Sequence, residues 1–128
     1  MIVLDASVLI AHLDATDAHH DRAQRLLLQA ADQELAASVV TVAEVLVAPA
    51  RAGQLARATA ALAELGVASV PLDVDAHVRL ATLRAETGLK LPDCCVLLAA
   101  EEGRGAVGTF DDRLAAAGRA RGHLVLGA

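Results

Sequence analysis

Short apolar segments alternate with longer segments of helical periodicity along the whole chain. The apolar runs predict buried strands at residues 1–4, 35–39, 67–72, 105–109 and 123–126. The amphipathic segments predict helices at residues 6–13, 21–31, 41–48, 53–65, 73–87, 93–102 and 111–117, with 14–21 as a loop. Strands joined by helical crossovers predict a parallel sheet that helices cover on both faces. We therefore expect one α/β domain over residues 1–128, without a linker or an internal repeat.

Glycine and proline mark the ends of several predicted helices. Pro49 should stop the helix at 41–48, Gly66 should close the helix at 53–65, and Pro92 suits a first helical turn. In the helix at 73–87, the residues expected near the buried side are Val74, Val78, Ala81, Leu83 and Ala85.

The composition restricts the chemistry that the chain can perform. Phe110 is the only aromatic residue, which argues against a platform that stacks nucleic-acid bases. The net charge of −5 argues against binding nucleic acid by a basic surface alone, unless bound cations neutralise part of the acids. The adjacent Cys94 and Cys95 are expected to be small core residues in a reducing cytosol. No signal peptide and no run of about 20 apolar residues is present, so we expect a cytoplasmic protein without membrane contact.

Four acidic residues fall where the predicted strands and helices meet. Asp5 directly follows the first strand and Asp111 follows the fourth, whereas Glu44 and Asp93 lie in first turns of helices that should enter from the same sheet edge. Ligands of an open parallel sheet bind beyond the carboxyl ends of its strands, where the strand order reverses. Converging carboxylates need compensation, and a site without histidine or cysteine suits Mg²⁺ or Mn²⁺ better than Zn²⁺.

Three of these acids also have a purely local interpretation. Thr41 and Glu44 fit a capping box, and Asp93 could complement a helix dipole. Asp111, or its neighbour Asp112, could cap the helix that follows. Nothing local requires an aspartate at position 5, so the combination of four acids favours a metal site.

Four segments of the chain, in order, resemble the motifs of PIN domains. They are LDASVLI at residues 4–10, SVVTVAEVL at 38–46, LPDCCVLLAA at 91–100 and VGTFDD at 107–112. At this length, the chain is most similar to the VapC toxins of bacterial toxin–antitoxin pairs. The resemblance implies a three-layer α/β/α sandwich around a five-stranded parallel sheet.

The same resemblance implies an activity, a set of site residues and partners. The activity is that of a Mg²⁺- or Mn²⁺-dependent endoribonuclease that hydrolyses RNA with metal-activated water. Its catalytic and metal-binding acids correspond to Asp5, Glu44, Asp93 and Asp111. Ser7 and Thr109 match hydroxyl positions that support the site, and the role of Asp112 is left open. The implied partners are RNA, a VapB-like antitoxin and a second copy of the chain.

Other residues extend this picture. Lys90 and Arg113 are the basic residues nearest in sequence to the acids and are candidate RNA contacts, as are Arg22, Arg25 and Arg51. His19 and His20 lie among aspartates but lack a third ligand at helical spacing, so we expect a solvated loop or a partner contact. The apolar run at residues 26–28, together with the helices between 41 and 65, could form a groove for an amphipathic segment of the antitoxin. A basic tail of that partner would then reach Asp5 and Asp93.

Two alternative functions remain open at this point. A PIN-like fold could be a non-catalytic interaction domain, although the presence of all four acids favours catalysis. A receiver-like phosphoacceptor also uses Mg²⁺ and aspartate, but it needs a lysine after its fifth strand. Asp73 follows the third predicted strand, whereas the only lysine, Lys90, lies in a loop.

Overall fold

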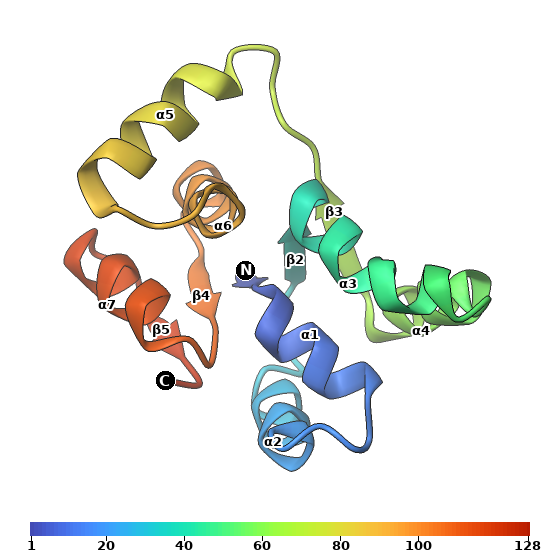
Figure 1. The fold of residues 1–128 in the computed structure, drawn as a ribbon. Helices are drawn as coiled ribbons and strands as arrows, with labels where there is room; N and C mark the ends of the chain where they lie inside the picture. Colours follow the sequence, from blue (N-terminus) through green and yellow to red (C-terminus); the bar gives the residue numbers. More distant parts are fainter.

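The computed structural model describes residues 1–128 as a five-stranded sheet flanked by seven helices (Figure 1). The strands are β1 (Ile2–Leu4), β2 (Leu35–Ser38), β3 (Val67–Val70), β4 (Ala106–Gly108) and β5 (Val125–Leu126). The helices are α1 (Ala6–Leu13), α2 (His20–Gln29), α3 (Val39–Arg51), α4 (Leu55–Leu65), α5 (Ala76–Thr87), α6 (Leu91–Gly103) and α7 (Asp112–Ala120). Every strand pair is parallel, and the order is β3-β2-β1-β4-β5. The predicted five-stranded parallel sheet is confirmed.

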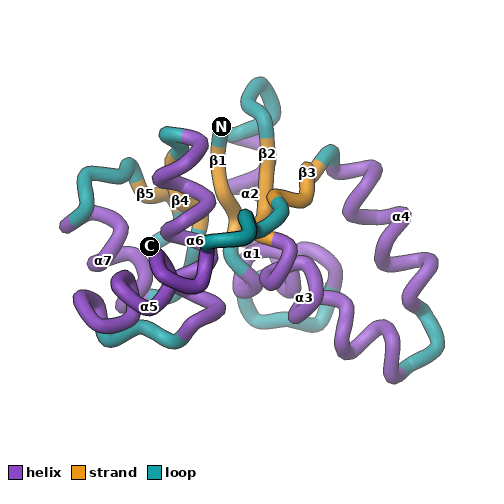
Figure 2. The backbone as a smooth tube through the Cα atoms, turned by 90° about the horizontal axis from the view of Figure 1, so that it is seen from above, coloured by secondary structure: helices purple, strands orange, loops and turns teal.

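Helices cover both faces of the sheet, as Figure 2 shows from above. Alternate residues of a strand point to opposite faces, so Ile2 and Leu4 join one core while Val3 joins the other. The first core contains buried residues of α1, α2, α3 and α4, and the second contains those of α5, α6 and α7. The predicted three-layer sandwich is therefore confirmed.

The predicted boundaries lie within about three residues of the observed ones, but Pro49 does not stop its helix. Helix α3 continues through Pro49 to Arg51. Pro49 has no N–H to donate to the Val45 carbonyl, but only two helical residues follow it. Gly66 does close α4, in the left-handed conformation with a φ of 81°, and Pro92 lies in the first turn of α6.

The start of α3 excludes the capping box expected at Thr41 and Glu44. Ser38 is the N-cap, and its hydroxyl accepts a hydrogen bond from the Val40 N–H at 3.3 Å. Thr41 is therefore the third residue of the helix, and Glu44 lies in its second turn rather than its first. The capping interpretation of Glu44 is wrong, because the cap precedes the predicted position by three residues.

The buried side of α5 also differs from the prediction. Val74 precedes the helix and is 97% exposed, and Val78 is 60% exposed. The residues that face the core are Ala76 and Leu83, with Leu80 partly buried, which follows the helical spacing i, i+4 and i+7. Ala81 and Ala85 are exposed, so only Leu83 of the predicted set is buried. None of the seven helices combines the length and apolarity needed to cross a lipid bilayer.

The cap assignment gives a direct stability test. Ser38→Ala should lower the free energy of unfolding by about 1 kcal/mol, because it removes the N-cap of α3. Glu44→Ala should cause no comparable loss, since Glu44 caps nothing. Urea denaturation of both variants and the wild type, with a chelator present, measures the difference. A loss confined to Glu44→Ala would contradict the assignment.

Candidate metal centre

The strand order reverses between β1 and β4, and this point defines the candidate site. The chain moves outward from β1 to β2 and β3, then crosses back to β4 and β5 on the other side. Asp5 follows β1 directly, and its backbone N–H donates to the Gly108 carbonyl at the end of β4. The carboxyl ends of these two strands therefore frame the crevice in which open parallel sheets bind ligands.

The Asp5 carboxylate is buried, 4% exposed, and both of its oxygens accept hydrogen bonds. Oδ1 accepts from the Ser7 hydroxyl at 2.6 Å and from the Val8 N–H at 3.2 Å, and Oδ2 accepts from the Thr109 hydroxyl at 2.5 Å. The bond to Val8 makes Asp5 the N-cap of α1. The expectation that nothing local requires an aspartate at position 5 is therefore wrong: a strand that runs straight into a helix needs a capping residue there.

Two hydroxyls join Asp5 to the turn between β4 and α7. The Ser7 hydroxyl donates to Asp5 and accepts from the Phe110 N–H at 3.1 Å. The Thr109 hydroxyl donates to Asp5 and accepts from the Asp111 N–H at 3.0 Å. Each hydroxyl proton is thereby directed at Asp5, and the turn is held against the end of β1.

Asp111 lies at the start of α7, and its local interpretation is confirmed. Its Oδ1 accepts from the Leu114 N–H at 2.8 Å, which makes Asp111 the N-cap. Its charge also raises the pKa of Asp5 and of Asp93, so it faces the same site. Asp112 is the first residue of α7; it is exposed and makes no side-chain hydrogen bond.

The four acids lie close enough together for their charges to raise the pKa values of Asp5, Glu44 and Asp93. Burial raises the pKa of Asp5, against the lowering effect of its hydrogen bonds, and Asp111 raises it further. Burial and then the charge of Asp5 raise the pKa of Glu44. Burial raises the pKa of Asp93, followed by the charges of Asp111, Asp5 and Glu44, while Lys90 lowers it. Lys90 is the only cation near enough to oppose this repulsion at Asp93.

The structure thus brings the four predicted acids to one sheet edge, but not into direct coordination geometry. Nowhere do three or more His, Cys, Asp or Glu side chains converge closely enough to hold one ion. The donor set nevertheless fits a hard divalent cation, because it is all oxygen and because Asp5 is a buried carboxylate whose hydrogen-bond partners are all neutral. One buried hydroxyl, the Oγ1 of Thr41, has no hydrogen-bond partner, which was not predicted from the sequence.

Two of the candidate RNA contacts, Lys90 and Arg113, lie at the starts of α6 and α7. Lys90 is exposed at the N-cap of α6, close enough to Asp93 to lower its pKa. Arg113, in the first turn of α7, lines a depression of about 540 Å³ together with Leu89, the neighbour of Lys90. Sequence reasoning missed Phe110, whose backbone enters the Asp5 network.

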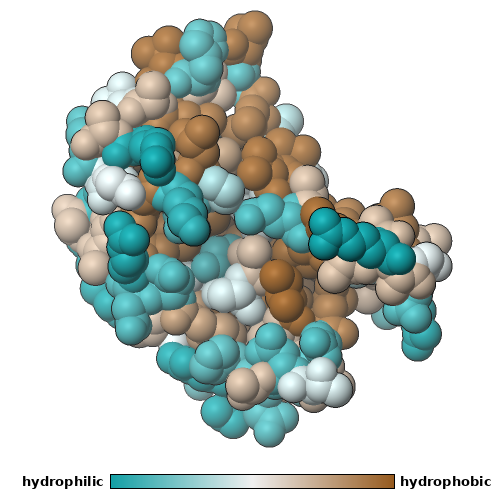
Figure 3. Space-filling view, viewed as in Figure 1, coloured by the Kyte–Doolittle hydropathy of each residue, from teal (hydrophilic) through white to brown (hydrophobic).

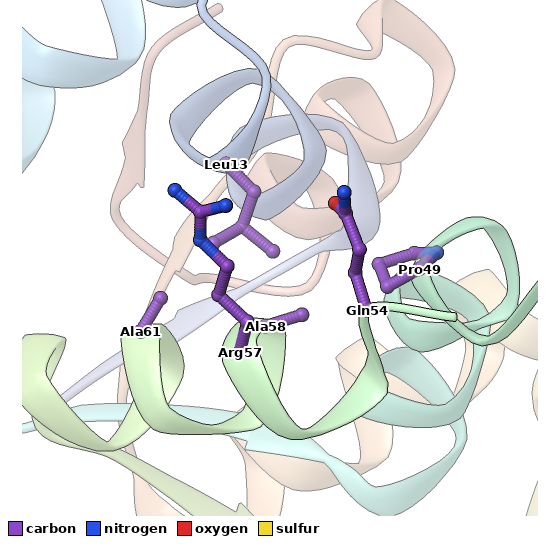
Figure 4. Close-up of a pocket in the computed structure, with 6 residues that line it drawn as sticks. All are labelled: Leu13, Pro49, Gln54, Arg57, Ala58 and Ala61. Atoms are coloured by element: carbon purple, nitrogen blue, oxygen red, sulfur yellow. The ribbon is translucent and has the colours of Figure 1, made fainter. Parts of the chain in front are cut away.

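A groove between α1, α3 and α4 opens next to the acids. One part, about 550 Å³, has Glu44 and Asp14 among its lining residues and Ile10, Val45 and Ala48 as apolar ones. A second part, about 310 Å³, shares Leu13, Pro49 and Gln54 with it and continues to Arg57 on α4 (Figure 4). We call these two parts the α1–α3–α4 groove. Asp14 is exposed there, and its hydrogen bonds from Thr16 lower its pKa.

The protein is therefore an α/β domain with a parallel sheet and four electrostatically coupled acids where the strand order reverses. The sequence signature of the PIN domain family matches residues 2–120. The chain belongs to the PIN domain family. No curated protein matches it by sequence.

Solved structures share this fold over most of their length. A toxin–antitoxin complex from Klebsiella pneumoniae is 28% identical, with a TM-score of 0.70 and 87% of each chain covered. VapC20 of Mycobacterium tuberculosis, described as a sarcin–ricin loop cleaving toxin, is 21% identical, with a TM-score of 0.74 over 92% of this chain and 95% of that one. VapBC2 of Rickettsia felis, solved with a DNA fragment from its promoter, is 13% identical, with a TM-score of 0.72 over 98% and 97% of the two chains.

The raised pKa of Glu44 predicts how stability depends on pH. The folded state holds the Glu44 proton more tightly than the unfolded chain does, so without metal the wild type loses stability as the pH rises from the unfolded value, about 4.3, through the folded one. Glu44→Gln should therefore melt at or above the wild-type temperature at pH 7 in chelator, and this advantage should shrink below about pH 4.

Glu34→Gln is the matched control, because Glu34 is exposed in a loop and lies outside the acid cluster. It should follow the wild type at both pH values in the same melting experiment. A lower melting temperature for Glu44→Gln than for both other proteins at pH 7 would contradict the repulsion.

Proposed function

We propose that this PIN domain is a divalent-metal-dependent endoribonuclease and the toxin of a toxin–antitoxin pair. The observation that carries the proposal is the buried Asp5 carboxylate, which has only neutral hydrogen-bond partners and is coupled to three further acids at the switch point. Family membership and the toxin structures among its structural neighbours support the nuclease and toxin assignments. An RNA substrate is proposed from the family resemblance and because VapC20, which shares the fold, is described as a sarcin–ricin loop cleaving toxin.

Different residues of the chain are proposed to bind the metal, to orient its ligands and to contact RNA. Asp5, Glu44, Asp93 and Asp111 would hold Mg²⁺ or Mn²⁺, drawn together by side-chain rotation around their present backbone positions. The bound cation supplies activation of water and stabilisation of the leaving oxygen. Ser7 and Thr109 are proposed to keep the Asp5 carboxylate in one orientation, and their hydrogen bonds to it support this role. Lys90 and Arg113 are proposed to contact RNA phosphates beside the acids.

The alternative functions fit the structure less well. A receiver-like fold has the strand order 2-1-3-4-5, whereas the order here is 3-2-1-4-5. A non-catalytic interaction domain would have no need to keep four mutually repelling acids at its switch point.

Metal-dependent cleavage is the first functional test. Asp93→Asn and Asp5→Asn should each lower the rate of RNA cleavage by roughly 100-fold or more, because each removes a ligand charge. Asp73→Asn, at an exposed position before α5, should keep the wild-type rate. Cleavage should require Mg²⁺ or Mn²⁺, so full activity in excess chelator would refute the mechanism.

The antitoxin is proposed to lie in the α1–α3–α4 groove, which corrects the location expected from sequence. Leu26 and Leu27 are buried in the first core, and Leu28, 75% exposed, does not line the groove. The groove offers an apolar floor with Glu44 and Asp14 at its rim. An amphipathic helix with a basic end fits this chemistry, and its arginine could neutralise the acids.

Substitutions at two exposed apolar residues test whether the antitoxin binds this groove or the surface on α2 that was predicted from the sequence. Ile10→Gln should weaken the complex with the proposed VapB-like antitoxin by at least tenfold, because Ile10, 41% exposed, lines the groove. Leu28→Gln should bind with wild-type affinity, and both variants should cleave RNA normally. Titration calorimetry measures both affinities; the opposite ranking would place the antitoxin on α2.

The second copy of the chain expected from the family resemblance is proposed to cover a different surface. Leu72, Val74 and Val78 leave an apolar surface exposed at the connection from β3 to α5. Figure 3 shows apolar side chains gathered at that end of the molecule. Contiguous exposed apolar surface of this kind is typical of interfaces.

A further inference from the structure

The single aromatic residue lies beside the catalytic edge rather than in the core of the domain. Phe110 is half-buried between Thr109 and Asp111, and its backbone N–H donates to Ser7, which in turn donates to Asp5. The backbone at Phe110 is therefore held relative to Asp5 by two consecutive hydrogen bonds.

The ring of Phe110 forms one wall of a small pocket against α2. The Arg22 guanidinium carbon lies 4.7 Å from the ring centroid, and the His19 ring centroid lies 5.4 Å away at an interplanar angle of 41°. The pocket has a volume of about 250 Å³, enough for a nucleobase. Its lining residues are Arg22, Arg25, Leu26, Gln29, Phe110, Leu126 and Gly127. We call it the Phe110 pocket.

Arginine gives this pocket a positive wall. Arg22 and Arg25 are one turn apart on the same face of α2, and neither forms an ion pair; the ion pairs of the chain involve Arg79 and Arg121. Arg22 donates to the Gly127 carbonyl, so its guanidinium is held in place over the ring. Arg25 is exposed and makes no hydrogen bond, so its guanidinium is free to bind an anion.

The part of the α1–α3–α4 groove that contains Glu44 has the opposite charge. Glu44 and Asp14 line this part, which disfavours a phosphate backbone there, and Arg57 lines only the second part of the groove. In Figure 1, α2 and α4 lie on different sides of α1. A polyanionic strand that crosses the acids is therefore directed toward α2, and a basic partner is directed toward α3 and α4.

We propose that the Phe110 pocket binds a nucleotide that flanks the scissile phosphate of a single-stranded RNA. Arg25 contacts the phosphate of this nucleotide, and its base packs against the Phe110 ring that lines the pocket. This proposal rests on the ribonuclease function and adds a base-stacking contact that the scarcity of aromatic residues argued against.

Binding measurements without cleavage test the pocket. A fluorescently labelled single-stranded RNA of mixed sequence is titrated with the full chain in chelator at several salt concentrations. Arg25→Gln should weaken binding and lower the slope of log K against log salt by about 0.7, the loss of one phosphate contact. Phe110→Leu should weaken binding about fivefold or more, with an unchanged slope, because it removes stacking but no charge.

Arg104→Gln is the matched control for charge. Arg104 is also exposed and free of ion pairs, but it lies at the C-cap of α6, before β4 and therefore at the sheet edge away from the acids. Arg104→Gln should bind RNA with the wild-type slope. Melting curves show whether Phe110→Leu is folded, and the exposed Arg25 gives a variant for which folding is not in question.

The outcomes separate the pocket from the ribonuclease function. The proposal for the Phe110 pocket would be overturned if the wild type bound RNA and neither Arg25→Gln nor Phe110→Leu weakened that binding. It would also be overturned if the wild type did not bind RNA. A parallel assay of the wild type in Mg²⁺ or Mn²⁺ tests cleavage itself. Pocket-dependent binding without cleavage would refute the ribonuclease and support the pocket. Loss of antitoxin binding alone in these variants would show that the pocket serves a protein partner and would overturn the proposal.

Discussion

The carboxylate of Asp5 is the group around which the rest of this structure is arranged. Its three hydrogen bonds join the end of β1, the start of α1 and the turn that follows β4. All three donors are neutral, so they orient the carboxylate without neutralising it, and burial still raises its pKa. The fold thus holds a desolvated acid between other acids at the strand-order reversal. A divalent cation is the species that would satisfy that charge.

The four acids are not equivalent, because two of them also cap helices. Asp5 caps α1 and Asp111 caps α7, so their positions are set by the same hydrogen bonds that start those helices. Glu44 and Asp93 project from α3 and α6 without a hydrogen bond to hold them. The site therefore combines a fixed pair with an adjustable pair. This explains how four acids can share one edge without three of them meeting at coordinating distance.

The sequence predicted those features that depend on periodicity and chain order. The sheet, its position between two helical layers and the convergence of Asp5, Glu44, Asp93 and Asp111 follow from the alternation of strands and helices. The phase of α5 was missed, because Val74 and Val78 are as apolar as Leu83 and only packing on α6 shows which residue is buried.

Two of the remaining errors concern contacts between residues far apart in the chain. The buried positions of Leu26 and Leu27 depend on packing against α1 and the sheet, which a local apolar run does not reveal. The pocket beside Phe110 joins α2 to the C-terminal strand, more than 80 residues away. Ser38 as the cap of α3 was missed because serine, valine and threonine follow one another there, and each fits a strand end as well as a helix start.

Direct binding of a divalent cation tests the central claim most closely. Titration calorimetry with Mn²⁺, in the absence of RNA, measures the affinity of the wild type and of Asp5→Asn, Asp93→Asn and Asp73→Asn. The account predicts that the wild type and Asp73→Asn bind Mn²⁺ alike, and that each of the two site variants binds at least tenfold more weakly. Equal Mn²⁺ affinity in all four proteins, or no binding by the wild type at millimolar Mn²⁺, would contradict it.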